Sequence, residues 1–375
     1  MALRIYFVAG EASGDNHGAA LMRSLRRLRP SIEMLGRGGP QMEQIARANF
    51  LDWSEEAGVV GLWEVLKHYP YFRREFHRTV KEIQAAKPDA VVLIDYPGFN
   101  LRLARTLHES SLGGKIIYYI SPQVWAWNRS RIPKMARWLD LMLCIFPFEA
   151  DLYERSGLRT IFVGHPMIEN LETKRSGESR DPKLIGLFPG SRAREVRKLT
   201  PIFVAAIREL RAHDPDLRFE IAAASDALAQ IIRDDLQAAG SLGGVKLTIG
   251  RAAETMQRSA AGLVASGTAT LEAAFFRMPF VLVYKVAGPT YLAGRILIRV
   301  PHLGMPNVLA GREIVPEFIQ HRAEPSEIAR AVLRLLEDET ARGKMLADLD
   351  EVIAKLGKGG ANDAAAKAIL NIVAT

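Results

Sequence analysis

Cysteine is almost missing from this chain of 375 residues, which has a single one, Cys144, inside the apolar run 141–146. A disulfide needs a pair of cysteines and a cysteine-rich zinc site needs several, so the composition excludes both. Cys144 is expected to be a small buried apolar side chain. A chain without disulfides fits a reducing compartment, and we expect a cytoplasmic protein.

Several other features are lacking as well. No run of about 18 apolar residues occurs, so the sequence predicts no membrane-spanning helix. There is no P-loop and no Gly-x-Gly-x-x-Gly fingerprint, which argues against nucleotide triphosphate hydrolysis and hydride transfer. No tight group of His, Asp and Glu has the spacing of metal ligands, so neither a metal nor another cofactor is expected.

The charge is moderately positive, with 50 Lys and Arg against 42 Asp and Glu and an isoelectric point near 9.6. This balance favours an anionic partner: a phosphorylated substrate, an acidic membrane surface or a nucleic acid. The basic residues are spread along the chain, and no helix-turn-helix, RNP or OB signature is present. A nucleic-acid-binding protein is therefore the less favoured class, and we expect no nucleic-acid partner.

Strand and helix patterns alternate along most of the chain. Expected strands in the first half are 4–8, 89–94, 115–120 and 139–146, and those in the second half are 184–188, 218–223, 245–248, 262–265 and 280–286. Such alternation predicts parallel sheets with right-handed crossovers. We expect an α/β fold of two Rossmann-like domains facing a cleft, at 1–165 and 184–349, joined by a linker at 166–183.

Two strand-to-helix turns in the second half have the composition of a phosphate site. They are Leu-Ile-Gly-Leu-Phe-Pro-Gly-Ser-Arg at 184–192 and Gly-Leu-Val-Ala-Ser-Gly-Thr-Ala-Thr-Leu-Glu at 262–272. The unpaired N–H groups and the dipole of a helix start suit a phosphate. The pair therefore indicates a nucleoside diphosphate site, although either turn could simply cap its helix. Its expected ligands are Gly190, Ser191, Arg192, Gly267 and Thr268 for the diphosphate, and Glu272 for ribose hydroxyls.

Longer motifs, taken together, resemble a known family. They are Ala-Gly-Glu-Ala-Ser-Gly-Asp at 9–15, Ile-Asp-Tyr-Pro-Gly-Phe-Asn at 94–100, Ser-Pro-Gln-Val-Trp-Ala-Trp at 121–127, Phe-Pro-Phe-Glu at 146–149, Val-Gly-His-Pro at 163–166, Pro-Gly-Ser-Arg at 189–192 with Glu195, Ala-Ser-Gly-Thr at 265–268, and Pro-Asn-Val-Leu-Ala-Gly-Arg-Glu at 306–313. This succession is similar to that of lipid-A-disaccharide synthases, from about Arg4 to the C-terminus. The Trp-Ala-Trp and Pro-Asn-x-Leu-Ala-Gly-Arg-Glu strings are specific, whereas the glycine turns are common to many folds.

The resemblance implies a GT-B fold in which the last helices, at about 350–375, cross back to the first domain. It implies an inverting, metal-independent transfer of 2,3-diacylglucosamine from UDP to 2,3-diacylglucosamine 1-phosphate. The products would be the β-1,6-linked lipid A disaccharide 1-phosphate and UDP, for lipopolysaccharide synthesis. It also implies a peripheral protein at the cytoplasmic face of a Gram-negative inner membrane, and it puts Asn307 and Glu313 at the UDP-sugar site.

Inverting transfer needs a base for the attacking hydroxyl and stabilisation of the departing diphosphate. Asp95 is the expected base because it ends a buried strand just before Tyr-Pro-Gly, and Arg192 is expected to stabilise the leaving group. Glu11 and Asp15, in the first glycine loop, are rival carboxylates. Asp95 could instead only tie down its turn, and Asp15 could cap a helix.

The first domain is expected to bind the acceptor, its acyl chains and the membrane. Trp125 and Trp127 would point the same way along an extended chain, as a sugar platform or acyl groove, or pack in the core. Segment 59–81 mixes aromatic and basic side chains, which suits an interfacial helix on anionic lipid or an amphipathic pair packed on the core; segment 291–299 is a second basic–apolar patch. The expected contacts are Ser13, Asp15, Trp63, Phe72, Phe76, Trp125 and Trp127.

Another UDP-sugar enzyme of the same fold is the alternative reading. A UDP-sugar 2-epimerase or a transferase with a different lipid-linked acceptor would share the diphosphate turns. The epimerase explains the basic apolar segment 59–81 less well. The sequence leaves a homo-oligomer open.

Overall fold

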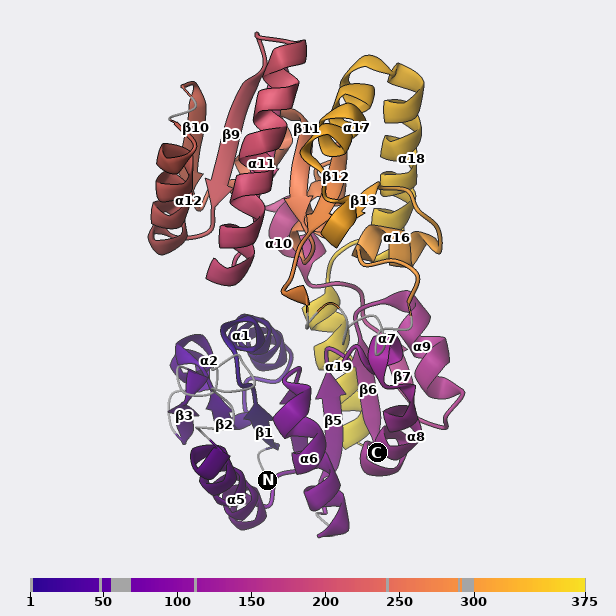
Figure 1. Ribbon diagram of the computed structural model, residues 1–375. Helices are drawn as coiled ribbons and strands as arrows, with labels where there is room; N and C mark the ends of the chain where they lie inside the picture. The colour runs from indigo at the N-terminus through magenta and orange to yellow at the C-terminus, as the bar shows by residue number, and fades with distance from the viewer. Residues whose placement is uncertain are drawn as a thin grey trace. The chain divides into compact units, whose positions relative to one another are not determined.

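The computed structural model describes residues 3–46, 49–54, 69–110, 113–240, 243–288, 291 and 300–374. The chain divides into two compact units, shown in Figure 1. The first unit comprises Met1–Glu169 and Leu356–Thr375, and the second comprises Asn170–Lys355.

The first unit is built on a seven-stranded sheet in which all neighbouring strands are parallel. In spatial order the strands are β3 (Phe50–Asp52), β2 (Glu33–Gly38), β1 (Arg4–Val8), β4 (Ala90–Ile94), β5 (Lys115–Tyr119), β6 (Leu141–Cys144) and β7 (Thr160–Phe162). The order reverses between β1 and β4, which makes this pair the switch point of a Rossmann-like sheet. Strand β4 is buried throughout, as expected for an apolar strand that is covered on both faces.

Helices connect these strands. They are α1 (Ala12–Leu28), α2 (Pro40–Ala46), α5 (Tyr69–Ala86), α6 (Pro97–Glu109), α7 (Val124–Trp127), α8 (Ile132–Trp138) and α9 (Pro147–Glu154), with a 3₁₀ turn at Arg129–Arg131. The C-terminal helix α19 (Ala361–Val373) returns to this unit and packs against α1. Asn362 accepts a hydrogen bond from the Tyr119 hydroxyl at 3.1 Å, and Asp363 forms an ion pair with Arg27.

The second unit repeats the plan with six parallel strands. Their spatial order is β10 (Val245–Ile249), β9 (Arg218–Ala223), β8 (Asp181–Phe188), β11 (Ser259–Ala265), β12 (Phe280–Tyr284) and β13 (Glu317–Ile319). The order reverses between β8 and β11, so the switch point of this sheet lies between the two strands that precede the glycine turns.

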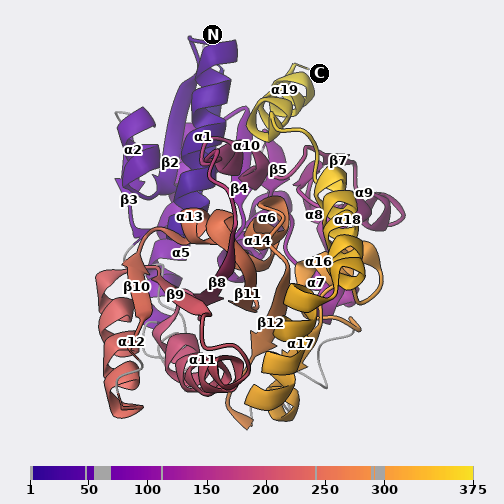
Figure 2. The same ribbon diagram turned by 90° about the horizontal axis from the view of Figure 1, so that it is seen from above.

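The helices of the second unit cover both faces of its sheet (Figure 2). One face carries α11 (Ala193–His213), α12 (Asp226–Ala238) and α17 (Pro325–Glu337), and the other carries α13 (Ala252–Arg258) and α14 (Ala269–Phe275). Helices α16 (Met305–Ala310) and α18 (Glu339–Lys355), with a 3₁₀ turn at Gln320–Arg322, complete the unit. A sheet covered in this way exposes only its strand ends to a ligand.

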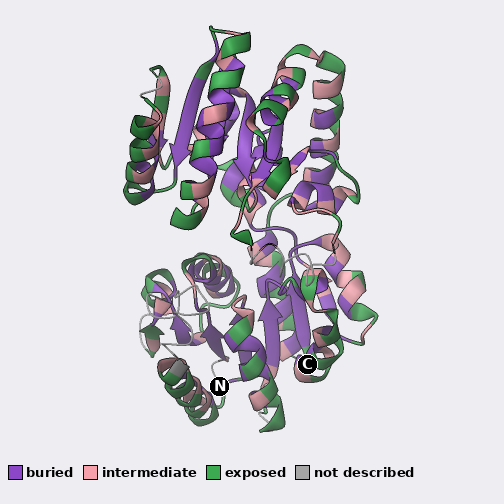
Figure 3. Cartoon of the chain, viewed as in Figure 1, coloured by how far each residue is buried: buried purple, intermediate pink, exposed green. Residues whose placement is uncertain are grey.

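The strands form the core of each unit, while the helices expose their outer faces (Figure 3). Cys144 is fully buried, in accord with its expected apolar role. The α/β class with two parallel sheets is confirmed. Segment 166–183 contains helix α10 (Met167–Glu172) and the first residues of β8.

Candidate active site

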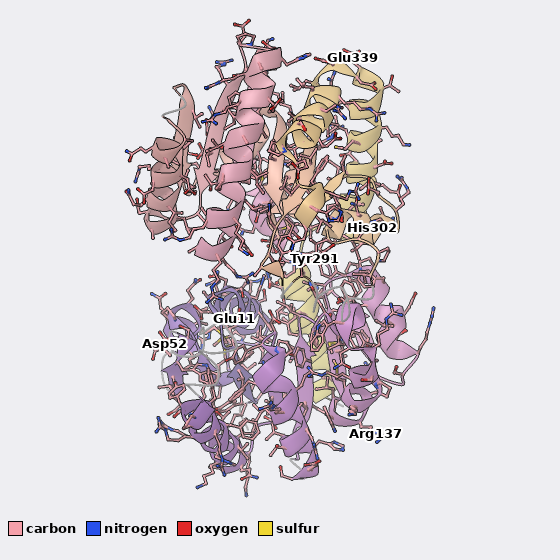
Figure 4. The ribbon with its side chains drawn as sticks, viewed as in Figure 1. Glu11, Asp52, Arg137, Tyr291, His302 and Glu339 are labelled. Carbon is pink, nitrogen blue, oxygen red and sulfur yellow. The ribbon has the colours of Figure 1, made fainter. Side chains whose placement is uncertain are left out.

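At the switch point of the first sheet, two carboxylates follow adjacent strands. Glu11 comes after β1 as the residue that precedes α1, and Asp95 comes directly after β4. Figure 4 marks Glu11 at the start of α1. The Glu11 charge raises the pKa of Asp95, so the two groups interact across the switch point.

Asp95 lies in a strained backbone turn. Asp95 and Tyr96 have φ angles of +44° and +51°, in the left-handed region that non-glycine residues avoid. Each such residue costs on the order of 1–3 kcal/mol, and such strain is concentrated at functional sites. The turn allows α6 to begin at Pro97, with only two residues between it and the end of β4 at Ile94.

The pKa of Asp95 is raised to about 6, mainly by burial and secondly by the charge of Glu11. A hydrogen bond from the backbone N–H of Tyr96 has the opposite, smaller effect. No side chain among the described residues donates a hydrogen bond to this carboxylate. A partly desolvated carboxylate with a pKa near 6 is ionised at neutral pH and is a stronger base than an ordinary aspartate. The geometry therefore suits a general base.

Tyr96 closes the turn against the first glycine loop. A Cβ atom on Gly10 would come within 2.4–2.6 Å of the Tyr96 ring, so the ring occupies the space that the missing side chain leaves. The ring also stacks on Phe99, with 6.0 Å between centroids. Burial raises the pKa of Tyr96 to about 12, which keeps the phenol neutral.

The Asp15 side chain makes hydrogen bonds within the fold, whereas the sequence predicted that it contacts the acceptor. Its carboxylate is buried and accepts hydrogen bonds from the backbone N–H groups of Gly39, Gln41 and Met42 at 2.9–3.1 Å. Asp15 thus caps α2, a helix distant in sequence, and not the helix that contains it. Ser13, two residues earlier, is exposed.

The Trp125–Trp127 segment is helical, so the expectation of two rings pointing the same way along an extended chain is wrong. Trp125 is only 4% exposed, and its indole N–H donates to Glu149 at 2.8 Å. Trp127 is 40% exposed and has the Arg131 guanidinium 4.8 Å from its ring centroid. Consecutive helical positions differ by about 100°, which places residues two apart on different faces. Only Trp127 is available to an acceptor or a membrane.

Glu149 is a buried carboxylate that the sequence analysis quoted in a motif but did not assign. It bonds the N–H of Phe146 at the start of α9 as well as Trp125. Burial raises its pKa to about 7. Glu149 is the third residue of α9, and nothing in the local sequence indicated its partner Trp125, which lies in α7, 24 residues earlier.

The basic–aromatic segment 59–81 is described only from Tyr69 onward, and Trp63 lies outside the described residues. Phe76 packs on the core, with its ring 5.5 Å from that of Phe99, whereas Phe72 is half-buried. The opposite face of α5 exposes basic side chains: Arg73, Arg74, His77, Arg78 and Lys81. The described part is therefore a core-packed amphipathic helix with a basic outer face, and Phe76, which is partly buried, contributes to the core packing. In the patch at 291–299, the structure describes Tyr291 alone.

A fully buried arginine anchors α5. Arg37, on β2, pairs with Glu75 at 2.6 Å and with both carboxylate oxygens of Glu82 at 2.7 and 2.9 Å. Glu82 also accepts a hydrogen bond from Tyr6 at 2.8 Å. Both glutamates of α5 therefore pair with Arg37, and Glu82 also pairs with Arg78 at 3.1 Å. The exposed cations of the helix outnumber its two glutamates, so its outer face is positive.

In the second unit, the two glycine turns lie side by side. Strands β8 and β11 pair with Phe188 opposite Val264, and a Cβ atom on Gly190 would be 3.6 Å from that of Ala265. Gly190 and Gly267 have φ angles of +110° and +146°, which L side chains rarely adopt. The two turns predicted to form one phosphate site thus meet at one switch point.

Helix α11 presents an open N-terminus at this point. Arg192 is its N-cap residue, and the Arg192 side chain makes no capping hydrogen bond. The Arg192 side chain is 70% exposed and lies 3.4 Å from Glu195, which also fills the space beside Gly190. Ser191 and Thr268, from the two turns, are exposed as well. These groups offer a cation, hydroxyls and N–H groups to an anion.

Glu272 lies in the first turn of α14 and is half-buried. Burial raises its pKa, while the charge of Lys174 lowers it. It has no hydrogen-bond partner among the described residues. A partly buried carboxylate without a partner can accept hydrogen bonds from ligand hydroxyls.

Asn307 has no free hydrogen-bonding capacity. Its amide nitrogen donates to the Val315 carbonyl and to Glu317, and its amide oxygen accepts from Ile314 and Val315 N–H, all at 2.8–2.9 Å. This argues against the direct UDP-sugar contact that the resemblance implies; the amide holds its own loop together instead. Glu313 is exposed and lines a cavity of about 400 Å³ beside α17 and α18.

Among the residues that the structure describes, no group of three or more His, Cys, Asp and Glu could hold a metal ion. No helix in the same part of the chain is long and apolar enough to cross a membrane.

Comparison with known proteins gives consistent results at the level of sequence. A family model described as lipid-A-disaccharide synthetase matches residues 5–372. The lipid-A-disaccharide synthase of Geobacter sulfurreducens is 41% identical over 99% of this chain and 97% of its own. The enzyme of the same name from Pseudomonas aeruginosa is 38% identical over 99% of this chain and 98% of its own.

Solved structures share the fold at much lower identity. A UDP-GlcNAc 2-epimerase from Neisseria meningitidis, bound to UDP-GlcNAc, superposes with a TM-score of 0.64 at 14% identity, covering 99% of this chain and 100% of that one. The calicheamicin glycosyltransferase CalG4 has a TM-score of 0.61 at 16% identity, with full coverage of both chains. Epimerases and transferases therefore share this architecture, and sequence similarity separates them.

Proposed function

Because this chain belongs to the lipid-A-disaccharide synthase family, and is thus a glycosyltransferase that forms the lipid A disaccharide, we propose which substrates and residues carry the reaction. The donor is UDP-2,3-diacylglucosamine and the acceptor is 2,3-diacylglucosamine 1-phosphate. The epimerase alternative is not favoured, since the close relatives by sequence are synthases.

Asp95 acts as the general base. In the proposed step it removes the proton from the acceptor 6-hydroxyl, whose oxygen attacks the anomeric carbon of the donor as the bond to UDP breaks. Attack from the opposite side inverts the α-linked donor to a β-1,6 linkage. The observation that carries this assignment is the strained, partly desolvated turn in which the pKa of Asp95 rises to about 6. The Glu11 charge supports the basicity of Asp95.

The second unit holds UDP and stabilises its departure. Arg192, Ser191 and Thr268 and the N–H groups around Gly190 and Gly267 bind the diphosphate, where negative charge grows as the glycosidic bond breaks. Glu272 accepts hydrogen bonds from the ribose hydroxyls. The converging turns and the open start of α11 support this assignment.

The first unit receives the acceptor and rests on the membrane. Its exposed Trp127, with Arg131 beside the ring, and the basic face of α5 suit an anionic lipid surface. This supports a peripheral protein at the cytoplasmic face of the inner membrane of a Gram-negative bacterium.

The test is a reconstituted reaction. Purified protein with the two acylated substrates, in chelator and without added metal, is expected to release UDP and a disaccharide, detected by mass spectrometry. Asp95→Asn should reduce turnover at least a thousandfold while UDP affinity, measured by calorimetry, stays within twofold. Full turnover in that variant would remove Asp95 as the base, and dependence on added metal would contradict the metal-free mechanism.

A further inference from the structure

The backbone of Asp95 is held by two side chains to which neither the sequence analysis nor the mechanism above gives a role: Asn100, the last residue of the 94–100 motif, and Tyr118. The Asn100 amide nitrogen donates to the Asp95 carbonyl at 2.8 Å, and the Tyr118 hydroxyl donates to the same oxygen at 2.5 Å. The Asp95 N–H in turn donates to the Tyr119 carbonyl at 3.0 Å. The peptide groups on both sides of the Asp95 Cα atom are thereby fixed, whereas the carboxylate is left without a side-chain donor.

We propose that Asn100 and Tyr118 are positioning residues for the catalytic base: together they clamp the Asp95 carbonyl and hold the left-handed turn that aims the carboxylate at the acceptor hydroxyl. This inference rests on the proposed role of Asp95.

The orientation of Asn100 is fixed by chemistry. Its nitrogen also lies 3.2 Å from the Ile94 carbonyl and 3.4 Å from that of Val8. Three carbonyl oxygens surround this end of the amide, so it must be the donor end, because an amide oxygen there would be repelled. Asn100 therefore ties the end of β4 to the end of β1, across the switch point.

The other end of the same amide is unsatisfied. Asn100 is fully buried, and its Oδ1 atom has no hydrogen-bond partner among the described residues. A buried acceptor without a partner destabilises a fold. An apolar side chain would avoid that penalty, so the hydrogen bonds of the donor end are what the amide contributes here.

Tyr118 supplies the second donor from a different element. It lies on β5, one strand beyond β4, and is fully buried with its hydroxyl directed at the Asp95 carbonyl. Burial and the neighbouring Asp95 charge keep its pKa well above the ordinary value, so the phenol remains a donor throughout the working pH range. The strained turn is thus held from α6 and from β5 at once.

A matched control exists on the same strand. Tyr119 is also fully buried, but its hydroxyl bonds Asn362 of α19, away from Asp95. Tyr118→Phe and Tyr119→Phe remove the same atom from adjacent residues whose side chains face opposite sides of the sheet. Only the first change removes a hydrogen-bond donor from the Asp95 carbonyl.

The experiment compares steady-state kinetics and the pH profile of kcat for both variants. Tyr118→Phe should lower kcat about fivefold, with KM for either substrate within twofold, because it releases only the base. Its acid limb should shift to lower pH, since a looser Asp95 becomes better hydrated. The titratable groups that face Asp95 are Glu11 from the start of α1, Tyr96 from its own turn and Tyr118 from β5. Tyr119→Phe should leave kcat and the acid limb unchanged.

Asn100→Ser provides the second measurement, with at least a tenfold fall in kcat. Circular dichroism and thermal melting select variants that fold. If Tyr118→Phe matches wild type in kcat and in pH profile, or if Tyr119→Phe shows the same losses, the clamp is refuted. Asp95→Asn, assayed in parallel, separates the two proposals: full turnover in that variant defeats the assignment of the base itself, whereas its loss with an unaffected Tyr118→Phe defeats only the clamp.

Discussion

The ionised carboxylate of Asp95 is expected to lower the free energy of unfolding. Its pKa is raised from 3.8 to about 6, mainly by burial, so the folded state binds a proton more tightly than the unfolded state. Stability therefore falls as pH rises from about 4 to about 6 and then stays reduced. Asp95→Asn should raise the free energy of unfolding at pH 8 by on the order of 2–3 kcal/mol, since one pKa unit corresponds to about 1.4 kcal/mol.

Urea unfolding of both proteins at pH 8 and at pH 4 measures this difference. The gain from Asp95→Asn should nearly vanish at pH 4, where the native carboxyl is already protonated. If Asp95→Asn is less stable than wild type at pH 8, contacts in the folded protein stabilise the Asp95 charge by more than burial destabilises it. A stability gain combined with lost turnover is the pattern of a residue kept for activity.

Arg192 is the second residue for which we predict the effect of a substitution. Its guanidinium is exposed at the start of α11 beside the two glycine turns. Charge-assisted hydrogen bonds contribute about 1.5–3 kcal/mol, so Arg192→Ala should weaken UDP binding about 10- to 100-fold and lower turnover as well. Calorimetric titration with UDP gives the affinity. Arg233→Ala, which removes an exposed arginine of α12, is the control, and equal affinities of the two variants would exclude Arg192 from the UDP site.

Motifs located these residues but could not assign their roles. Asp95 and Glu11 were placed correctly at strand ends, because a buried strand and a following turn are visible in local sequence. The hydrogen-bond partners of Asp15 lie 24 or more residues away in the sequence. Those of Asn307 lie within its own folded loop. Whether a polar side chain faces a ligand or the backbone depends on that tertiary context, which motif spacing does not contain.

Among the elements, helix α5 combines a buried anchor with a positive outer face. Its two glutamates pair with the buried Arg37, and they also pair with Arg74 and Arg78, but its exposed cations outnumber them and remain to attract anionic lipid. Basic residues near an anionic surface contribute about 1 kcal/mol each. Arg73→Glu with Lys81→Glu should therefore lower binding to phosphatidylglycerol vesicles at least tenfold, in a sedimentation assay.

The control for that variant carries the same charge change elsewhere. Arg233→Glu with Lys344→Glu reverses two exposed cations of the second unit and should retain most vesicle binding. Binding should also weaken at 1 M salt, because screening shortens the reach of charges to about 3 Å. Equal losses in both variants would mean that net charge, and not the face of α5, governs association.

Strands were predictable from sequence in proportion to their apolar character. Strand β4 (Ala-Val-Val-Leu-Ile) is a continuous apolar run and was expected, as was the buried second part of β8, Leu184–Phe188, but not its polar start at Asp181–Lys183. Strand β2 was missed because it carries two glycines and Arg37, whose charge is neutralised only by the folded α5. The short strands β3, β7 and β13 pair at sheet edges, where three residues give no periodic pattern.

On the scale of the whole molecule, the order of the strands brings the two glycine turns together. The sequence indicated two phosphate-type turns 77 residues apart at Gly190 and Gly267, but not that β8 and β11 would be neighbours. Adjacency comes from the packing of strands into a sheet and has no local signature. The same holds for β1 and β4 in the first unit, whose pairing brings Glu11 and Asp95 together.

Because the C-terminal helix belongs to the first unit, its deletion is expected to destabilise that unit and not the second. Deleting 356–375 removes α19 with its buried Ala365, Ile369 and Ile372, and breaks the contacts to Arg27 and Tyr119. The first unit should then unfold at lower temperature, while the second unit keeps its own transition. Differential scanning calorimetry with limited proteolysis checks this, and a resistant fragment near 170–355 is expected. Deleting only 374–375 should change nothing; a uniform loss of both transitions would show that the units do not melt separately.

The discontinuous first unit also sets an order of events on the ribosome. The second unit is one uninterrupted stretch, Asn170–Lys355, so all of its strands have emerged before α19 has been translated. The first unit is incomplete, with the flank of α1 uncovered, until α19 has been translated. We would look for chaperone capture of nascent chains during that interval, and for its disappearance in a circular permutant that begins with α19.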